Sequence, residues 1–357
     1  MLDLKIFNKN IDNFKKHLLN HKRIGYFKRH MSTFGSHLSL NKLTNLILNE
    51  IEMRLRIASP ISLPVYLKVE PTPLCQLRCM GCYQKEPNFK HDLLKLNNGN
   101  MFLSLEDLKK IIDPLKDTLI GVSLSLYGEP LLNKNIVLLI EYLHSNNIAV
   151  SFPTNLSIKF SYNQIAELVK SGLDCIEVSL DGASQESYNK YRIGGNFELV
   201  LKNVKLLSEA KKHLNLKNPQ IVWKYIVFDH NKHETGMINT IYKKLGFDRY
   251  EIEYDNYSDI ETKIKIDNSK NLVKAKKPCY WLWNTTIIRW DGNVKPCCTT
   301  SDDFTLGNAI KYNIKEIWRS DEYRVLREGF LKRQYGQYMH PICKKCTGLS
   351  NNTYLIN

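Results

Sequence analysis

The chain has 357 residues, of which 43% are hydrophobic and 24% charged, and this length suits one large α/β domain with additions or two domains. The net charge is +15, but no aromatic-rich basic segment accompanies it, so we expect no nucleic-acid binding. No apolar run is long enough to cross a membrane and no signal-peptide pattern opens the chain, so we expect a cytoplasmic protein, in which nine cysteines indicate metal ligation rather than disulfides.

Residues 1–60 are predicted to form a basic helical extension, with eleven Lys/Arg against four Asp/Glu. Apolar residues recur at helical spacing in two stripes: Phe7, Ile11, Phe14 and Leu18, then Leu40, Leu43, Ile47, Ile51 and Leu55. Two interpretations are open. The extension either packs against the main domain, which we favour, or makes peripheral contact with an anionic membrane.

Residues 61–257 alternate short β-rich runs with longer amphipathic segments. The predicted strands span 65–70, 119–124, 148–153, 175–180, 221–227 and 250–254. The first predicted helix begins at Ser104, and four others span 136–145, 162–171, 197–212 and 234–245. Six strand–helix units predict an α/β fold, a parallel sheet curled into a partial (β/α)6 TIM-type barrel, in which functional residues lie at the carboxyl ends of the strands.

Polar or glycine-rich motifs follow the first four predicted strands. The first contains Cys75, Cys79 and Cys82, three thiols within eight residues, which can ligate three irons of a cubane cluster and leave the fourth iron open. The alternatives for these cysteines are a zinc knuckle or a few buried residues of the core. The other motifs are Gly128-Glu129-Pro130, then Asn155, then Ser179 with Asp181. Each is common in turns or at strand exits, but their order after the cysteines supports one shared site.

This combination resembles the radical S-adenosylmethionine (SAM) superfamily, whose Cys-x3-Cys-x2-Cys motif binds a [4Fe-4S] cluster with SAM on the open iron. The SAM contacts that the resemblance implies are Gly128, Glu129 and Pro130 for the amino group, Ser179 and Asp181 for the ribose and carboxylate, and Asn155. The protein would then bind both SAM and the cluster.

Two residues depart from the family pattern. Gly81 stands where an aromatic residue usually packs near the adenine, and Tyr83 could take over that contact. Tyr127 stands where the second motif often has its first glycine, which narrows the space beside SAM. Neither change removes a cluster ligand.

The C-terminal part is predicted as a linker at 258–277, a small α+β domain at 278–350 and a tail at 351–357. A hairpin turn is predicted at Trp290-Asp291-Gly292-Asn293, and a helix with the apolar residues Ile317, Leu326 and Phe330 is predicted to start at Asn313. Such a small domain needs a staple, and four cysteines can supply it: Cys279, Cys297, Cys343 and Cys346.

This segment resembles the SPASM/twitch domains of radical SAM enzymes in their single-cluster form. The resemblance implies an auxiliary [4Fe-4S] cluster on the four cysteines. A structural zinc site with the same ligands is the alternative, because cysteine spacing alone does not separate zinc from iron. Cys298 adjoins a ligand, and three roles are open: none, hydrogen-atom donor to a substrate radical, or substitute ligand.

Three other positions can be judged from their local pattern. Cys175, at a strand start, reads as a buried small residue. At most one of Lys224 and Tyr225 can face the barrel interior. His230 and Asn231 read as surface loop residues.

The radical SAM resemblance implies a reaction. A low-potential donor such as flavodoxin or ferredoxin reduces the cluster, SAM is cleaved, and the 5'-deoxyadenosyl radical takes a hydrogen atom from the substrate. The auxiliary cluster favours oxidation, whereas a thiol donor favours epimerisation. A small polar substrate such as a sugar or cyclitol is favoured, and a ribosomally made peptide is the alternative. A non-catalytic metal-binding protein that docks to an anionic surface is a second alternative.

Overall fold

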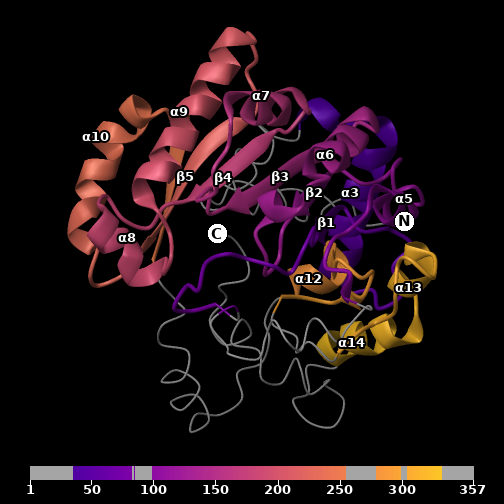
Figure 1. Cartoon of the computed structure of the whole chain (residues 1–357). Coiled ribbons are helices and arrows are strands. Elements are labelled where there is room, and N and C mark those ends of the chain that lie inside the picture. Colours follow the sequence, from indigo (N-terminus) through magenta and orange to yellow (C-terminus); the bar gives the residue numbers. More distant parts are fainter. Residues whose placement is uncertain (1–34, 83, 85–98, 255–278, 299–303, 332–357) are drawn as a thin grey trace, which may run out of the picture.

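The computed structural model describes residues 35–82, 84, 99–254, 279–298 and 304–331. Within them the chain forms an eight-stranded sheet in the order β6-β5-β4-β3-β2-β1-β7-β8 (Figure 1). Neighbouring strands from β6 to β7 are parallel, and β8 pairs antiparallel with β7. The predicted α/β class with a parallel sheet is confirmed, and the open order fits a partial barrel.

The six predicted strands of the barrel are all present, within two residues of their expected ends. They are β1 (Tyr66–Val69), β2 (Gly121–Leu124), β3 (Ala149–Thr154), β4 (Cys175–Ser179), β5 (Gln220–Val227) and β6 (Arg249–Tyr254). The helices among them are α5 (Leu105–Ile112), α6 (Ile136–Ser145), α7 (Tyr162–Lys170), α8 (Gln185–Tyr191), α9 (Phe197–His213) and α10 (Thr235–Leu245), with 3-10 turns η4 (Pro130–Leu132) and η5 (Lys232–Glu234). The sequence prediction lacked α8, because this short polar segment has no apolar stripe; a capping box between Ser184 and Ser187 starts it.

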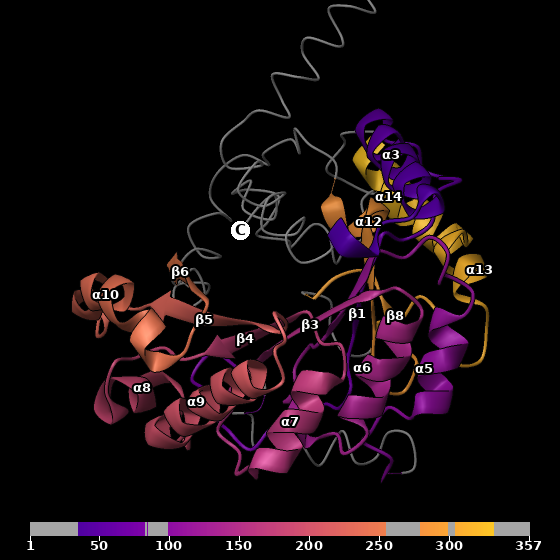
Figure 2. The ribbon, with the colours of Figure 1, turned by 90° about the horizontal axis from the view of Figure 1, so that it is seen from above.

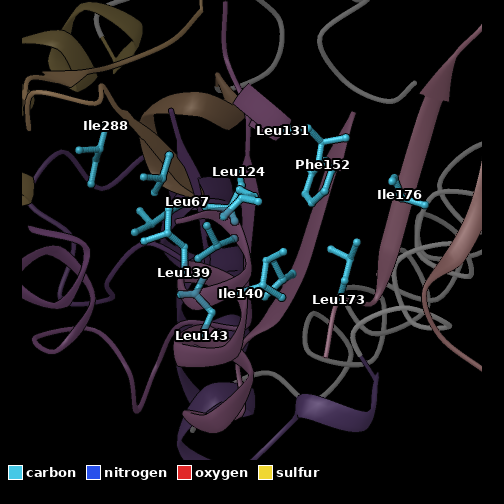
Figure 3. Close-up of a cluster of buried hydrophobic side chains, with 14 of the residues drawn as sticks. Leu67, Leu124, Leu131, Leu139, Ile140, Leu143, Phe152, Leu173, Ile176 and Ile288 are labelled. Carbon is cyan, nitrogen blue, oxygen red and sulfur yellow. The ribbon is translucent and has the colours of Figure 1, made fainter. Parts of the chain in front are cut away.

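Helices α5, α6, α7 and α9 lie along one face of the sheet (Figure 2). Because side chains alternate along a strand, every second strand residue points to those helices. Leu67, Leu124 and Phe152 do so, in one buried cluster with Leu139 and Leu143 of α6 (Figure 3). The opposite face, which we call the inner face, is polar and positions the chemistry described below.

The sheet continues across the predicted boundary at residue 278. Helix α12 (Tyr280–Trp283) leads into β7 (Thr285–Ile288), which pairs in parallel with β1, and β8 (Val294–Lys295) completes the predicted hairpin. Gly292 has φ +86 in its turn, where a Cβ would approach Asn308 Oδ1 to 2.6 Å. The hairpin therefore extends the barrel sheet instead of standing apart from it. The predicted linker at 258–277 lies outside the described residues.

The predicted helix after Asn313 is present but divided. Asn313 caps α13 (Ile314–Trp318), and a second helix, α14 (Asp321–Leu331), follows. The buried Arg327 of α14 stacks on Trp318 and Tyr323, with centroid distances of 4.4 and 4.8 Å. The expectation of one helix was wrong, since the chain turns after α13 to bring these rings against the guanidinium.

Helix α3 (Leu40–Leu55), which follows the turn η1 (Gly35–His37), is the part of the extension that the structure describes. It packs against the main domain, but through its polar face. Glu52 accepts hydrogen bonds from the backbone N–H groups of Ile61 and Ser62, and Asn49 donates to the Trp283 carbonyl.

The predicted apolar stripe of α3 points away from the domain. Its five residues, Leu40, Leu43, Ile47, Ile51 and Leu55, are between 41% and 79% exposed. The predicted helical periodicity is therefore confirmed, and α3 contacts the domain through the side opposite its apolar stripe. The first stripe lies outside the described residues. No helix among those the structure describes is long and apolar enough to cross a membrane.

Candidate active site

The three clustered cysteines lie on a loop directly after β1, at the carboxyl end of the sheet. Cys79 is buried, and Cys75 and Cys82 are partly buried. Two backbone hydrogen bonds hold this loop to the end of α8 and the residues that follow it: Arg78 N–H to the Ile193 carbonyl (3.0 Å) and Met80 N–H to the Tyr191 carbonyl (3.2 Å).

Hydrogen-bond donors point at two of the sulfurs. The Asn155 side-chain amide lies 3.6 Å from Cys75 Sγ, and Arg192 Nη1 lies 3.8 Å from Cys79 Sγ. Burial raises the pKa of the Cys75 thiol to about 12, so a thiolate at this position needs a compensating positive charge. Donors aimed at buried thiols are what an iron–sulfur cluster on these cysteines requires, and the residues present fit that group.

Glu129 joins the ends of β2 and β3. Its Oε1 accepts from the Thr154 hydroxyl (2.6 Å) and from Leu131 N–H (3.2 Å), and its Oε2 accepts from Asn155 N–H (2.8 Å). Burial raises the pKa of this carboxyl to about 7, and the same hydrogen bonds oppose the rise. Glu129 thus fixes the position of Asn155, which in turn contacts Cys75.

Gly128, before it, has a packing requirement independent of any ligand. A Cβ at this position would lie 1.9 Å from the Thr72 carbonyl oxygen and 2.7 Å from that of Leu74. The segment leading to Cys75 therefore crosses directly over Gly128. Pro130 begins the turn η4 and is buried.

Asp181, which is buried, forms an ion pair with the partly buried Arg192 just after the end of β4. Asp181 Oδ2 accepts from Arg192 Nε (2.6 Å), and Oδ1 accepts from Ile226 N–H (2.7 Å). Burial lowers the pKa of Arg192, but the nearby negative groups, with Asp181 the largest contributor, together outweigh burial and raise it. Asp181 is fully buried, so it orients Arg192, whose Nη1 reaches the cysteine loop. Ser179, also buried, ends β4 on the inner face.

Sequence reasoning missed Arg192, because no motif marks the segment after α8. It also placed Asn231 wrongly on the surface. Asn231, which directly precedes η5, is buried and donates to the Asp181 carbonyl (3.1 Å) and the Ile226 carbonyl (2.9 Å).

Gly81, the first departure from the family pattern, lies beside Tyr191. A Cβ at position 81 would be 3.4 Å from the Tyr191 hydroxyl oxygen. The Tyr191 ring lies 4.4 Å from the Phe228 ring, centroid to centroid, and 5.1 Å from the Arg192 guanidinium. An aromatic pair from other elements thus lies next to the position that lacks an aromatic side chain. Tyr83, the residue predicted to compensate, lies outside the described residues.

Tyr127, the second departure, connects the barrel to the hairpin. Its backbone N–H donates to Glu70 Oε1 (3.1 Å), and its hydroxyl donates to the Cys298 carbonyl (3.3 Å). Arg289 forms a buried ion pair with Glu70 and lies 5.0 Å from the Tyr127 ring centroid. Tyr127 therefore fixes where Cys298 lies relative to β1.

Two of the four predicted auxiliary-cluster ligands are described. Cys279 precedes α12 and Cys297 follows β8, and the β7–β8 pairing joins both to one hairpin unit. Both are partly buried. Cys343 and Cys346 lie outside the described residues.

The inner face carries ion pairs that span neighbouring strands. Lys224 Nζ lies 3.7 Å from Glu177 of β4 and 3.2 Å from Glu253 of β6. Tyr225, the next residue of β5, is buried on the opposite face and donates to Glu234 (2.8 Å). The expected alternation of these two residues is confirmed, as is the burial of Cys175.

In the comparison with known proteins, two family models match segments of this chain. The radical SAM superfamily model matches residues 69–218, and the SPASM iron-sulfur cluster-binding domain matches residues 279–347. A GTP 3',8-cyclase of Desulforamulus reducens is 29% identical over 42% of this chain, and the match spans 44% of the cyclase. A tungsten-containing aldehyde ferredoxin oxidoreductase cofactor-modifying protein of Pyrococcus furiosus is 23% identical over 79% of this chain and 87% of its own length. Among solved structures, Streptococcus suis SuiB bound to its precursor peptide SuiA has a TM-score of 0.58 at 16% identity, covering 94% of this chain and 82% of SuiB, which shows a shared fold.

Proposed function

Because the chain belongs to the radical SAM superfamily and carries a C-terminal SPASM domain, we propose that it abstracts a hydrogen atom from a small polar substrate and directs the resulting radical to oxidation or epimerisation. These two domains imply SAM, a SAM-binding [4Fe-4S] cluster and auxiliary iron–sulfur chemistry. The observation that carries the proposal is that Asn155, held by Glu129, points a donor at Cys75. Arg192 points another at Cys79 of the same loop, at the carboxyl end of the sheet.

The proposal assigns roles to the chain's own residues. Cys75, Cys79 and Cys82 would hold the SAM cluster, which when reduced supplies the electron that splits SAM into methionine and a 5'-deoxyadenosyl radical. Glu129 holds the strand end that presents Asn155, and Asp181 holds Arg192 beside Cys79. Cys279 and Cys297 would contribute half the ligands of an auxiliary cluster.

The polar inner face supports a polar substrate. Glu177, Lys224 and Glu253 lie on three adjacent strands and are each partly exposed there. Burying charged groups is unfavourable unless they are paired or meet a polar ligand. A sugar-like or cyclitol-like molecule would meet such groups with its hydroxyls.

Modification of a peptide or protein is the second candidate. Two similar proteins support this candidate. A cofactor-modifying protein matches most of this chain, and the structure of SuiB was solved with a precursor peptide bound. A short precursor peptide encoded beside the gene would support this candidate, and glycosyltransferase genes there would support the first.

The proposal is tested by anaerobic purification and iron analysis. We expect about eight irons per chain, as two cubane clusters require, and release of 5'-deoxyadenosine from SAM with a low-potential donor such as flavodoxin or ferredoxin. Bound zinc and no SAM cleavage would contradict the proposal and favour a non-catalytic metal-binding protein.

Cys298 is the candidate hydrogen-atom donor in the epimerisation branch. Replacement by alanine should retain the iron content but abolish turnover and accumulate a substrate radical, detectable by electron paramagnetic resonance. Unchanged turnover in the Cys298→Ala protein would reject the donor role and leave oxidation as the proposed outcome.

A further inference from the structure

Lys68 is a cation on the inner face that the site described above does not use. It lies in the middle of β1, where Leu67 and Val69 are buried against the helices and Lys68 points the other way, partly buried. Within the described part of the chain, its ammonium makes no hydrogen bond or ion pair. Lys68 therefore differs from three other basic residues that line this face, Arg249, Lys224 and Arg289.

Those other basic residues are neutralised. Arg289 pairs with Glu70, Lys224 pairs with Glu177 and Glu253, and Arg249 pairs with Glu251. Burial lowers the pKa of the Lys68 ammonium, and nearby Lys224 lowers it further. Glu177 and Glu70 oppose this from a distance, but their ion pairs are with Lys224 and Arg289. An ammonium in such surroundings is unfavourable without a counter-charge, so its retention needs a reason.

The strand register places two hydroxyl groups beside Lys68. Lys68 is aligned with Ser123 of β2, and Ser123 is aligned with Ser151 of β3. Aligned residues on adjacent strands lie roughly 5 Å apart and point to the same face, so the three form one row. All three are partly buried, and the Ser123 hydroxyl lies 2.9 Å from that of Ser125.

We propose that Lys68, Ser123 and Ser151 bind an anionic group of the substrate, a carboxylate or a phosphate. A lysine ammonium binds such anions as a point charge, and hydroxyl groups donate to the remaining oxygens. The row begins on β1, the strand that leads to the cysteine loop, so an anion bound there keeps the substrate on the inner face near the proposed SAM site. This inference rests on the proposed function and narrows its substrate to an anionic molecule.

The test is equilibrium dialysis of radiolabelled inorganic phosphate against the anaerobically reconstituted full chain with SAM. We expect saturable binding to the wild type and at least a tenfold weaker affinity in Lys68→Met, because this variant lacks the positive charge and the hydrogen-bond donors of the ammonium. Lys68→Arg should recover part of the affinity, and Ser151→Ala should weaken it by less than Lys68→Met. Lys205→Met, which removes an exposed lysine of α9, is the matched control and should bind like the wild type.

Folding of the variants is checked by their iron content. Lys68→Met should load iron normally, because a neutral side chain replaces an ammonium without a partner. Absence of saturable phosphate binding to the wild type, equal affinity in Lys68→Met, or equal loss in Lys205→Met would each overturn the inference. SAM cleavage by the wild type is measured separately, so its failure would count against the proposed function and a dialysis failure against the anion site.

Discussion

Glu129 shows what a motif residue does before any ligand arrives. The resemblance implied that it accepts a hydrogen bond from SAM, and both of its oxygens already accept hydrogen bonds from the protein. The Gly128-Glu129-Pro130 motif could be found from the sequence because its three residues are adjacent in the chain. The Asp181–Arg192 ion pair could not be predicted from the sequence, because its two residues follow different elements and come together only when the chain folds.

Glu129→Gln should lower the affinity for SAM and the rate of its cleavage by about tenfold or more. The amide nitrogen cannot accept, so a backbone N–H group or the Thr154 hydroxyl loses its partner at a cost of about 1–3 kcal/mol. Isothermal titration with SAM and chemical denaturation would measure the two effects. Glu141→Gln, an exposed change on α6, is the control. Wild-type values in Glu129→Gln would show that the carboxylate is dispensable.

Arg192→Gln should destabilise the fold by about 3–5 kcal/mol, because it leaves the buried Asp181 carboxylate without its charge partner. Denaturant unfolding of the apoprotein would measure the loss. Adding Asp181→Asn to Arg192→Gln should recover part of it. If the two changes are additive, the residues are not coupled.

At the scale of elements, periodicity located helices well and their orientation poorly. The stripe of α3 marks a real helix, yet the polar residues face the domain because Asn49 and Glu52 satisfy backbone groups of the 61–62 segment and α12. The orientation of the helix depends on its tertiary partners. The sequence of the helix alone does not show which of its sides will face unpaired polar groups of the domain. The strands were found more accurately because each is short and β-rich, and a motif follows each of the first four.

Asn49→Ala should lower the free energy of unfolding by about 2 kcal/mol, since it removes buried hydrogen bonds to Ser62, Trp283 and Asn284. Ile47→Ser, on the exposed side of the same helix, should change it by less than about 0.5 kcal/mol. Urea denaturation of both variants provides the comparison. A large effect of Ile47→Ser would mean that the exposed stripe is covered in solution.

At the scale of the whole molecule, one sheet contains strands from the two domains that the sequence analysis separates. Composition predicted a linker before the C-terminal cysteines, but no local pattern could show that β7 pairs with β1. Strand pairing over more than 200 residues depends on register and shape, which single-sequence patterns do not contain. The predicted domain boundaries therefore remain a proposal. The hydrogen-bonded sheet contains strands from both the predicted barrel and the predicted C-terminal domain.

A chain ending at residue 257 should aggregate or lose iron. Without β7, the backbone groups on one side of β1 lose their partners, and β1 becomes an exposed edge. Light scattering and iron content, compared with the full chain, would test this. A stable, monomeric, iron-loaded short chain would show that β1 does not depend on β7.

The Glu70–Arg289 ion pair and the β1–β7 pairing have a kinetic consequence. Domains joined by a linker usually move relative to each other, so electron exchange between centres on them can depend on how often the domains meet. Here the strand that leads to Cys75 is hydrogen-bonded to the strand that follows Cys279. Electron tunnelling between centres at these cysteines would then occur over a fixed distance, and its rate would be insensitive to the viscosity of the solvent.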